Sequence, residues 1–164
     1  MLKRFKALRE KLERNTELLT TCEITADDVP QINASLFRFE AFGEIQNALQ
    51  VKNYFTIAES NKQTTFALWT KNLFIIDDAI EKYGTKKPDN MFIIYSEPYM
   101  NMCLTSADVR TLKSEHPYVD KVFTVHNKQS VLPDELVNCG SRKCIDCRLF
   151  YSKNNVSVIN EKLK

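Results

Sequence analysis

The stretch MFIIY at residues 91–95 decides the predicted fold. Every position in it is apolar, which is typical of a strand that is covered on both faces. A strand with one solvent-exposed face would instead alternate apolar and polar residues. The polar turn KKPDN at 86–90 precedes the stretch. The pattern therefore predicts a buried strand of a parallel sheet, with a layer of structure on each side.

Strands and helices are predicted to alternate before and after this strand. Short apolar, aromatic and β-branched stretches indicate strands, and apolar residues at helical spacing indicate helices. In chain order the predicted elements are a strand at 35–39, a helix at 45–60, a strand at 64–70, a helix at 72–83, the strand at 91–95, a helix at 109–115 and a strand at 122–125. This alternation predicts an α/β fold, with a small parallel sheet of about four strands joined by right-handed crossover helices. The sheet is expected to be either open and doubly wound or a partial barrel.

The N-terminal region adds a helix outside this core. Leu2, Phe5, Leu8 and Leu12 recur at spacings of three or four among Lys, Arg and Glu, which predicts an amphipathic helix within residues 1–20.

Residues 1–164 are predicted to form a single domain. The length is that of one ordinary domain, and a hydrophobic content of 43% suffices for one core. The β-α-β-α-β-α-β core is expected at 35–127. A cysteine-rich turn at 139–151 and a basic C-terminal tail follow it.

Polar residues follow the ends of the four predicted strands. The carboxyl ends of parallel strands meet at one edge of a sheet, where α/β proteins bind ligands. The residues expected at this edge are Arg38 with Glu40, Thr70 with Lys71, Ser96 with Glu97, and His126 with Asn127. His126 and Glu97 stand where a general base is often found, although no partner group in the sequence supports that role. Trp69 fits two interpretations, which are stacking on a base or sugar and packing in the core.

Three cysteines lie within nine residues, in the sequence NCGSRKCIDCRLFY. Cys139, Cys144 and Cys147 have the spacing C-x4-C-x2-C, and thiolates are the ligands that zinc and iron–sulfur clusters select. The basic residues between them favour ionised thiols. The motif therefore predicts a metal or iron–sulfur site, and the alternative is three free thiols in a loop.

A closed structural zinc site needs four protein ligands, so this motif is one ligand short. His126, Cys103 and Cys22 have the chemistry to supply the fourth, whereas a cluster could leave one iron open. An isolated cysteine is more often a small buried apolar residue than a ligand, which is the alternative for Cys22 and Cys103. The predicted site therefore consists of the three clustered cysteines with His126.

Composition and charge restrict the protein's location and partners. The N-terminus is charged throughout, no stretch approaches the roughly 18 apolar residues of a membrane span, and five cysteines do not suggest a disulfide framework. We therefore expect a soluble cytoplasmic protein without a membrane partner. Residues 1–14 and 139–164 each carry six basic and two acidic residues, although the net charge of the chain is only +2. These basic ends either contact nucleic acid or an acidic protein partner, or are solvated lysines and arginines.

Several catalytic motifs are absent from the sequence. It contains no GxGxxG, phosphate-binding loop, HExxH or GxSxG pattern, and only three glycines. A nucleotide kinase or a dehydrogenase is therefore disfavoured, and no reaction can be assigned.

Five stretches of the chain, in this order, resemble the bacteriophage gene-product-88 family. They are NTELL, FRFEAFGE, FALWTKN, PDNMFIIYS and CGSRKCIDCRLFYSKNNVSVINEKLK. The resemblance runs from about residue 14 to the C-terminus. It implies a fold similar to an incomplete α/β barrel of the radical-SAM type, in a bacterial or infected host cell.

Two departures from the family pattern bear on the site. Relatives usually carry a fourth cysteine at the position of Phe150, and a further upstream region with its own cysteine motif. The resemblance therefore implies a shortened member. Its C-x4-C-x2-C motif also differs in spacing and place from the N-terminal C-x3-C-x2-C motif of radical-SAM proteins, so radical chemistry is not expected.

Three functions remain open on the sequence alone. The first is a phage or mobile-element protein that binds zinc or an iron–sulfur cluster through the cysteine motif. The second is a nucleic-acid-binding accessory protein, with basic ends on phosphates and the cysteine turn as a zinc knuckle. The third is a degenerate, non-catalytic interaction domain.

Overall fold

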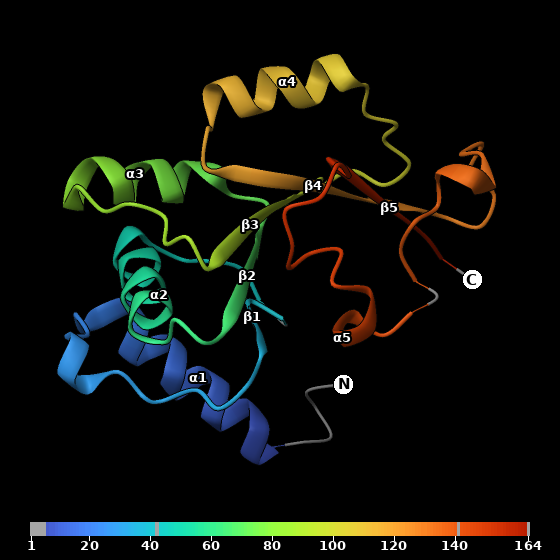
Figure 1. The fold of residues 1–164 in the computed structure, drawn as a ribbon. Helices are drawn as coiled ribbons and strands as arrows, with labels where there is room; N and C mark the ends of the chain where they lie inside the picture. The colour runs from blue at the N-terminus through green and yellow to red at the C-terminus, as the bar shows by residue number, and fades with distance from the viewer. Residues whose placement is uncertain (1–5, 42, 141, 164) are drawn as a thin grey trace.

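The computed structural model describes residues 6–41, 43–140 and 142–163. Within them, five parallel strands form one sheet (Figure 1). The strands are β1 (Leu36–Phe39), β2 (Thr65–Thr70), β3 (Met91–Ser96), β4 (Val119–His126) and β5 (Val158–Lys162). Their order in the sheet is their order in the chain. The predicted parallel α/β sheet is confirmed, and β5 adds a fifth strand within the predicted basic tail.

Three crossover helices join the first four strands. They are α2 (Ala48–Ser60), α3 (Leu73–Tyr83) and α4 (Ser106–Glu115). Each connection steps in the same direction across the sheet, and right-handed crossovers that step one way all pass over the same face. The sheet is open, and its first four strands are wound on one face by these helices rather than on both faces as in a doubly wound sheet; β1 and β5 are the two edges of the described sheet.

Local hydrogen bonds set the ends of these helices. The Asn47 side chain accepts a hydrogen bond from the Gln50 N–H at 2.9 Å, so α2 begins at residue 48 rather than 45. Thr105 and Asp108 form a capping box, so α4 begins three residues earlier than predicted. Gly84 adopts a φ of 58° and ends α3 as predicted.

The N-terminal helix α1 (Lys6–Thr21) packs against α2 on the outside of the domain (Figure 1). The predicted helix is confirmed, although Leu2 and Phe5 lie outside the described residues. Leu8 is exposed and Leu19 is half-buried against the core. No helix in the described part of the chain is both long and apolar enough to cross a membrane.

Alternate residues of the strands form two separate cores. On the helix side, Phe66, Leu68 and Ile93 are fully buried beneath α2 and α3. On the other side, Trp69 and Ile94 belong to a second apolar cluster. Both faces of β2 and β3 are therefore covered, which explains why these two strands are apolar at nearly every position.

The C-terminal segment, residues 139–156, covers the second face. It contains the short helix α5 (Cys144–Cys147), and its Phe150 packs in the second cluster with Trp69 and Phe123. The connection from β4 to β5 thus crosses the face opposite the helices while it steps in the same direction. Its hand is therefore opposite to that of the other three connections, which is rare in parallel sheets. A 3-10 turn, η3 (Asp134–Leu136), precedes the segment.

Two buried asparagines of the α2 region attach the connection between α1 and β1. Asn53 accepts a hydrogen bond from the Ile24 N–H at 2.9 Å and donates to the carbonyls of Leu19 and Cys22. Asn61, at the end of α2, accepts from the Ile32 N–H at 2.7 Å. A second 3-10 turn, η2 (Ala26–Asp28), lies between these two attachment points. These amides replace the regular hydrogen bonds that this non-periodic segment lacks.

Replacing Asn53 with alanine is expected to lower the free energy of unfolding by about 2–3 kcal/mol, because three backbone groups lose their partner. Urea denaturation followed by circular dichroism measures this loss. Gln63→Ala is the control, since Gln63 donates only one exposed hydrogen bond to the same segment. Its effect should stay within about 0.5 kcal/mol. Equal effects of the two substitutions would contradict the proposed attachment.

Candidate functional site

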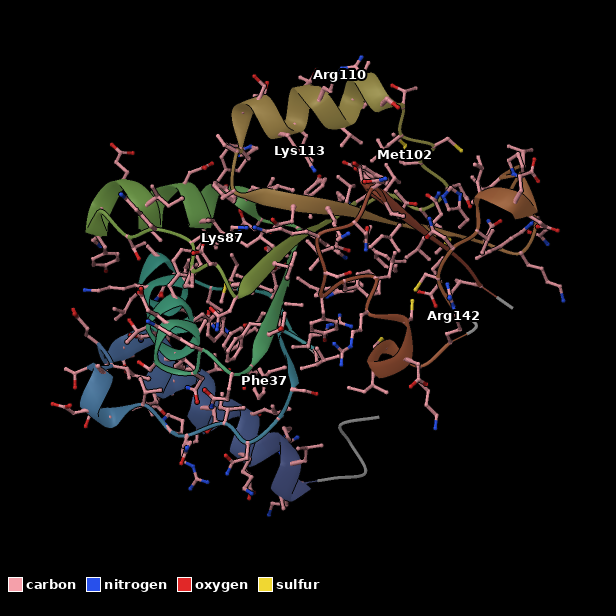
Figure 2. All side chains as sticks on the ribbon, viewed as in Figure 1. Phe37, Lys87, Met102, Arg110, Lys113 and Arg142 are labelled. Carbon is pink, nitrogen blue, oxygen red and sulfur yellow. The ribbon has the colours of Figure 1, made fainter. Side chains whose placement is uncertain are left out.

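All three predicted cysteine ligands line one small pocket on the C-terminal segment. Cys144 and Cys147 are the first and last residues of α5, and Cys139 precedes it. Figure 2 shows sulfur atoms beside α5, near the labelled Arg142. The structure therefore brings the three cysteines together, as their spacing predicts.

Backbone geometry places the cysteines around this pocket. Gly140 has a φ of 106°, a left-handed conformation that a side chain would strain. Arg148 ends α5 with a φ of 51°, and its N–H donates to the Cys144 carbonyl at 2.8 Å. Cys139 forms an isolated parallel bridge with Glu161 of β5, so one cysteine is fixed to the sheet. Cys144 is exposed and Cys147 is half-buried.

Burial and negative charge keep Cys139 protonated. Burial is the main cause that raises the pKa of the Cys139 thiol to about 11, and the Glu161 carboxylate raises it further. A cation in the pocket would oppose both effects, because thiolates are the form that binds metals. Glu161 was not among the residues predicted from the sequence.

Arg38 brings a positive charge to the same face of the sheet. Its guanidinium carbon lies 3.9 Å from the centroid of the Trp69 ring. Burial lowers the pKa of Arg38, and its electrostatic interactions with Tyr151, Cys144 and Glu161 oppose that decrease. Arg38 therefore faces the cysteine segment from the opposite edge of the sheet.

Trp69 is 9% exposed and packs in the core, so the core-packing interpretation is confirmed. Its ring centroid lies 4.4 Å from that of Phe150 and 4.6 Å from that of Phe123. The buried Nε1 atom has no hydrogen-bond partner among the described residues. Phe150 thus packs on this face of the sheet together with Leu149, Tyr151 and Val156 of the same segment.

His126 does not lie with the cysteines. Its side chain is fully buried and bonds to Thr124 Oγ1 at 3.1 Å and Ser130 Oγ at 3.2 Å. Thr124 and His126 point to the helix side of β4, whereas Phe123 and Val125 point to the cysteine side. The sequence predicts that His126 supplies the fourth ligand. In the structure, its side chain lies on the other face of the sheet from the cysteine pocket.

The other candidates for a fourth ligand, Cys22 and Cys103, are exposed. Among the residues that the structure describes, no three His, Cys, Asp or Glu side chains converge closely enough to hold a metal ion as they stand. A metal would therefore require side chains at the pocket to turn toward one another.

A separate polar cluster lies at the carboxyl ends of β1 and β2, where polar residues were expected. Glu40 accepts hydrogen bonds from Tyr54 Oη at 2.5 Å and Gln50 Nε2 at 2.9 Å. Glu44 accepts from the Thr70 hydroxyl and, at 2.7 Å, from the Lys71 N–H. Burial, and then the Glu44 charge, raise the pKa of Glu40. The sequence predicts Glu40, Thr70 and Lys71 at this edge of the sheet. It does not predict their partners, which are Tyr54 and Gln50 of α2 and Glu44 of the preceding loop.

A comparison with protein families found one matching family model, described as gene product 88, over residues 1–153. The match extends further toward the N-terminus than the sequence resemblance and ends before β5. Comparisons with curated proteins and with solved structures found no match.

Alkylation by iodoacetamide is expected to distinguish the cysteines. At pH 8, Cys22 and Cys103 should react while Cys139 does not, because its raised pKa leaves almost no thiolate. Reaction at Cys139 should rise only as the pH approaches 11. Peptide mass spectrometry after timed labelling measures this order, and rapid labelling of Cys139 at pH 8 would contradict its burial.

Phe150→Cys is expected to destabilise the fold by about 3 kcal/mol, because it removes a buried aromatic ring. Chemical denaturation checks this value. Phe74→Cys is the matched control, since Phe74 is 79% exposed, and it should change stability by less than about 0.5 kcal/mol. Equal stability of the two variants would show that Phe150 does not anchor the C-terminal segment.

Proposed function

The chain belongs to the bacteriophage gene product 88 family, and we propose that it binds a thiophilic metal ion or an iron–sulfur cluster through Cys139, Cys144 and Cys147. The observation that carries the proposal is that these three thiols, and no other cysteine, line one pocket. Soft thiolate ligands select zinc and iron–sulfur clusters over hard cations.

We assign the fourth position to Glu161 instead of His126. The bridge between Cys139 and Glu161 puts a carboxylate beside the half-buried Cys139 thiol, on the same side of the sheet. Carboxylate oxygen is an accepted ligand of zinc. The negative charge of Glu161, which disfavours a free Cys139 thiolate, would instead favour a bound cation.

The residues present fit such a group in chemistry, although their side chains must reorient. Cys139 is held by β5, whereas Cys144 is exposed at the start of a helix of only four residues. When bound, zinc would crosslink the C-terminal segment to β5, and an iron–sulfur cluster would add a redox centre. Arg38 would offset part of the negative charge of several thiolates.

The proposal is tested on protein purified without oxygen. Elemental analysis and the visible spectrum should reveal bound zinc, or iron with brown colour, and the triple variant with Cys139, Cys144 and Cys147 changed to Ser should lose it. The control with Cys22 and Cys103 changed to Ser should retain it, because both residues lie outside the pocket. Wild-type protein without zinc or iron, even after reconstitution, would refute the proposal.

Glu161→Gln tests the fourth ligand. Loss of an outer partner of a metal ligand already costs about tenfold or more in affinity, so loss of a direct ligand should weaken zinc binding at least as much. Competition with a chromophoric chelator measures the affinity. Glu59→Gln, on the exposed end of α2, should leave it unchanged. Equal affinities would assign the fourth position elsewhere.

A nucleic-acid-binding role is the second candidate. Arg142, Lys143 and Arg148 are all exposed around the cysteine pocket, which supports contact with phosphates. Binding of single- or double-stranded DNA should weaken steeply as salt rises. Binding that is absent or independent of salt would exclude this role.

A further inference from the structure

A cavity of about 590 Å³ lies between α4 and the start of β5, on the helix side of the sheet. Its volume is within the range of about 300–1,000 Å³ that small-molecule sites occupy. The cysteine pocket lies on the opposite side. The two features are therefore separate.

The cavity follows from the unusual β4–β5 connection. Three helices cover the helix side as far as β4, but the last connection crosses the other face, so no crossover helix of the described residues lies over β5 (Figure 1). Val109 of α4 and Val158 of β5 line the cavity and supply an apolar part.

The polar lining of the cavity is basic and rich in hydroxyl groups. Arg110 and Lys113 come from α4, together with Ser106 and Ser114, and Ser157 comes from the segment before β5. Figure 2 labels both cations along α4. No acidic side chain lines the cavity among the described residues.

Two nearby acidic side chains are engaged elsewhere. Asp108 accepts hydrogen bonds from Thr105 in the capping box, and the Asp120 carboxylate pairs with Lys87 at 2.7 Å. Among the described residues, Lys113 donates only to the Asp120 backbone carbonyl, at 2.6 Å, which leaves two of its N–H donors for a ligand. Neither Lys113 nor Arg110 forms a salt bridge in the part of the chain described.

We propose that this cavity binds a phosphate ester. Its phosphate oxygens would accept hydrogen bonds from Lys113, Arg110 and the serine hydroxyls, while the attached organic group lies against Val109 and Val158. A phosphate offers more acceptor oxygens than a carboxylate, which matches two cations and three hydroxyls. Contact with the organic group would make the site prefer a phosphate ester to inorganic phosphate.

Isothermal titration with AMP, and with inorganic phosphate for comparison, tests the proposal on the full chain. AMP should bind saturably and more tightly than inorganic phosphate, and Lys113→Gln and Arg110→Gln should each weaken it by about tenfold or more. Lys62→Gln is the control, since Lys62 is exposed just after α2, and should leave binding unchanged. Arg110 is exposed as well, so its variant should keep the wild-type unfolding midpoint and separate a lost contact from misfolding.

Competition with a single-stranded oligonucleotide distinguishes a free nucleotide from a nucleic-acid backbone as the source of the phosphate ester. Displacement of the oligonucleotide by AMP in wild type, but not in Lys113→Gln, assigns backbone phosphates to the cavity. AMP binding without displacement assigns a small ligand. No AMP binding, or equal weakening by Lys62→Gln, overturns the proposal. The triple cysteine variant should still bind AMP, so the outcome is independent of the metal proposal.

Discussion

Packing of Phe150 against Trp69 is the interaction on which the rest of the structure depends. The contact, 4.4 Å between ring centroids, holds the C-terminal segment on the face of the sheet that the helices leave bare. The segment held by this contact covers β2 and β3 and carries the cysteines. From there the chain returns to the edge of the sheet where β5 pairs with β4. The last connection therefore lies away from the helix side, where the cavity beside α4 is found. Both candidate sites therefore follow from one placement of the chain.

Much of the fold follows from the sequence because the central strands are buried on both faces. The stretches MFIIY and TTFALWT are apolar at most positions, so each is recognised as a buried strand from its own residues alone. The helix between them has regular apolar spacing. β5 lacks such a signal, because only Ile159 in it is fully buried and its other residues are half-exposed. The direction in which the chain winds is also absent from local patterns, since strand order depends on long-range pairing. For this reason the winding of the sheet emerges only from the structure.

The candidate site was predictable where its residues are close in sequence. Cys139, Cys144 and Cys147 share one turn, so their spacing alone indicates a common pocket. The position of His126 depends instead on strand register, and a bulge between β3 and β4 helps to decide which face each β4 residue occupies. Glu161 could not be identified, because only its pairing with Cys139 across the sheet makes it relevant. The role of Phe150 also depends on the fold, because only the structure shows that its ring packs against Trp69.

X-ray absorption spectroscopy of the zinc-loaded protein tests the central claim most directly. The proposed site predicts a first shell of about three sulfur atoms at about 2.3 Å and one oxygen at about 2.0–2.2 Å. The sulfur shell should disappear when the three pocket cysteines are replaced by serine. A first shell of nitrogen and oxygen alone, or a sulfur shell that survives those substitutions, would contradict the assignment of the cysteine pocket as the metal site.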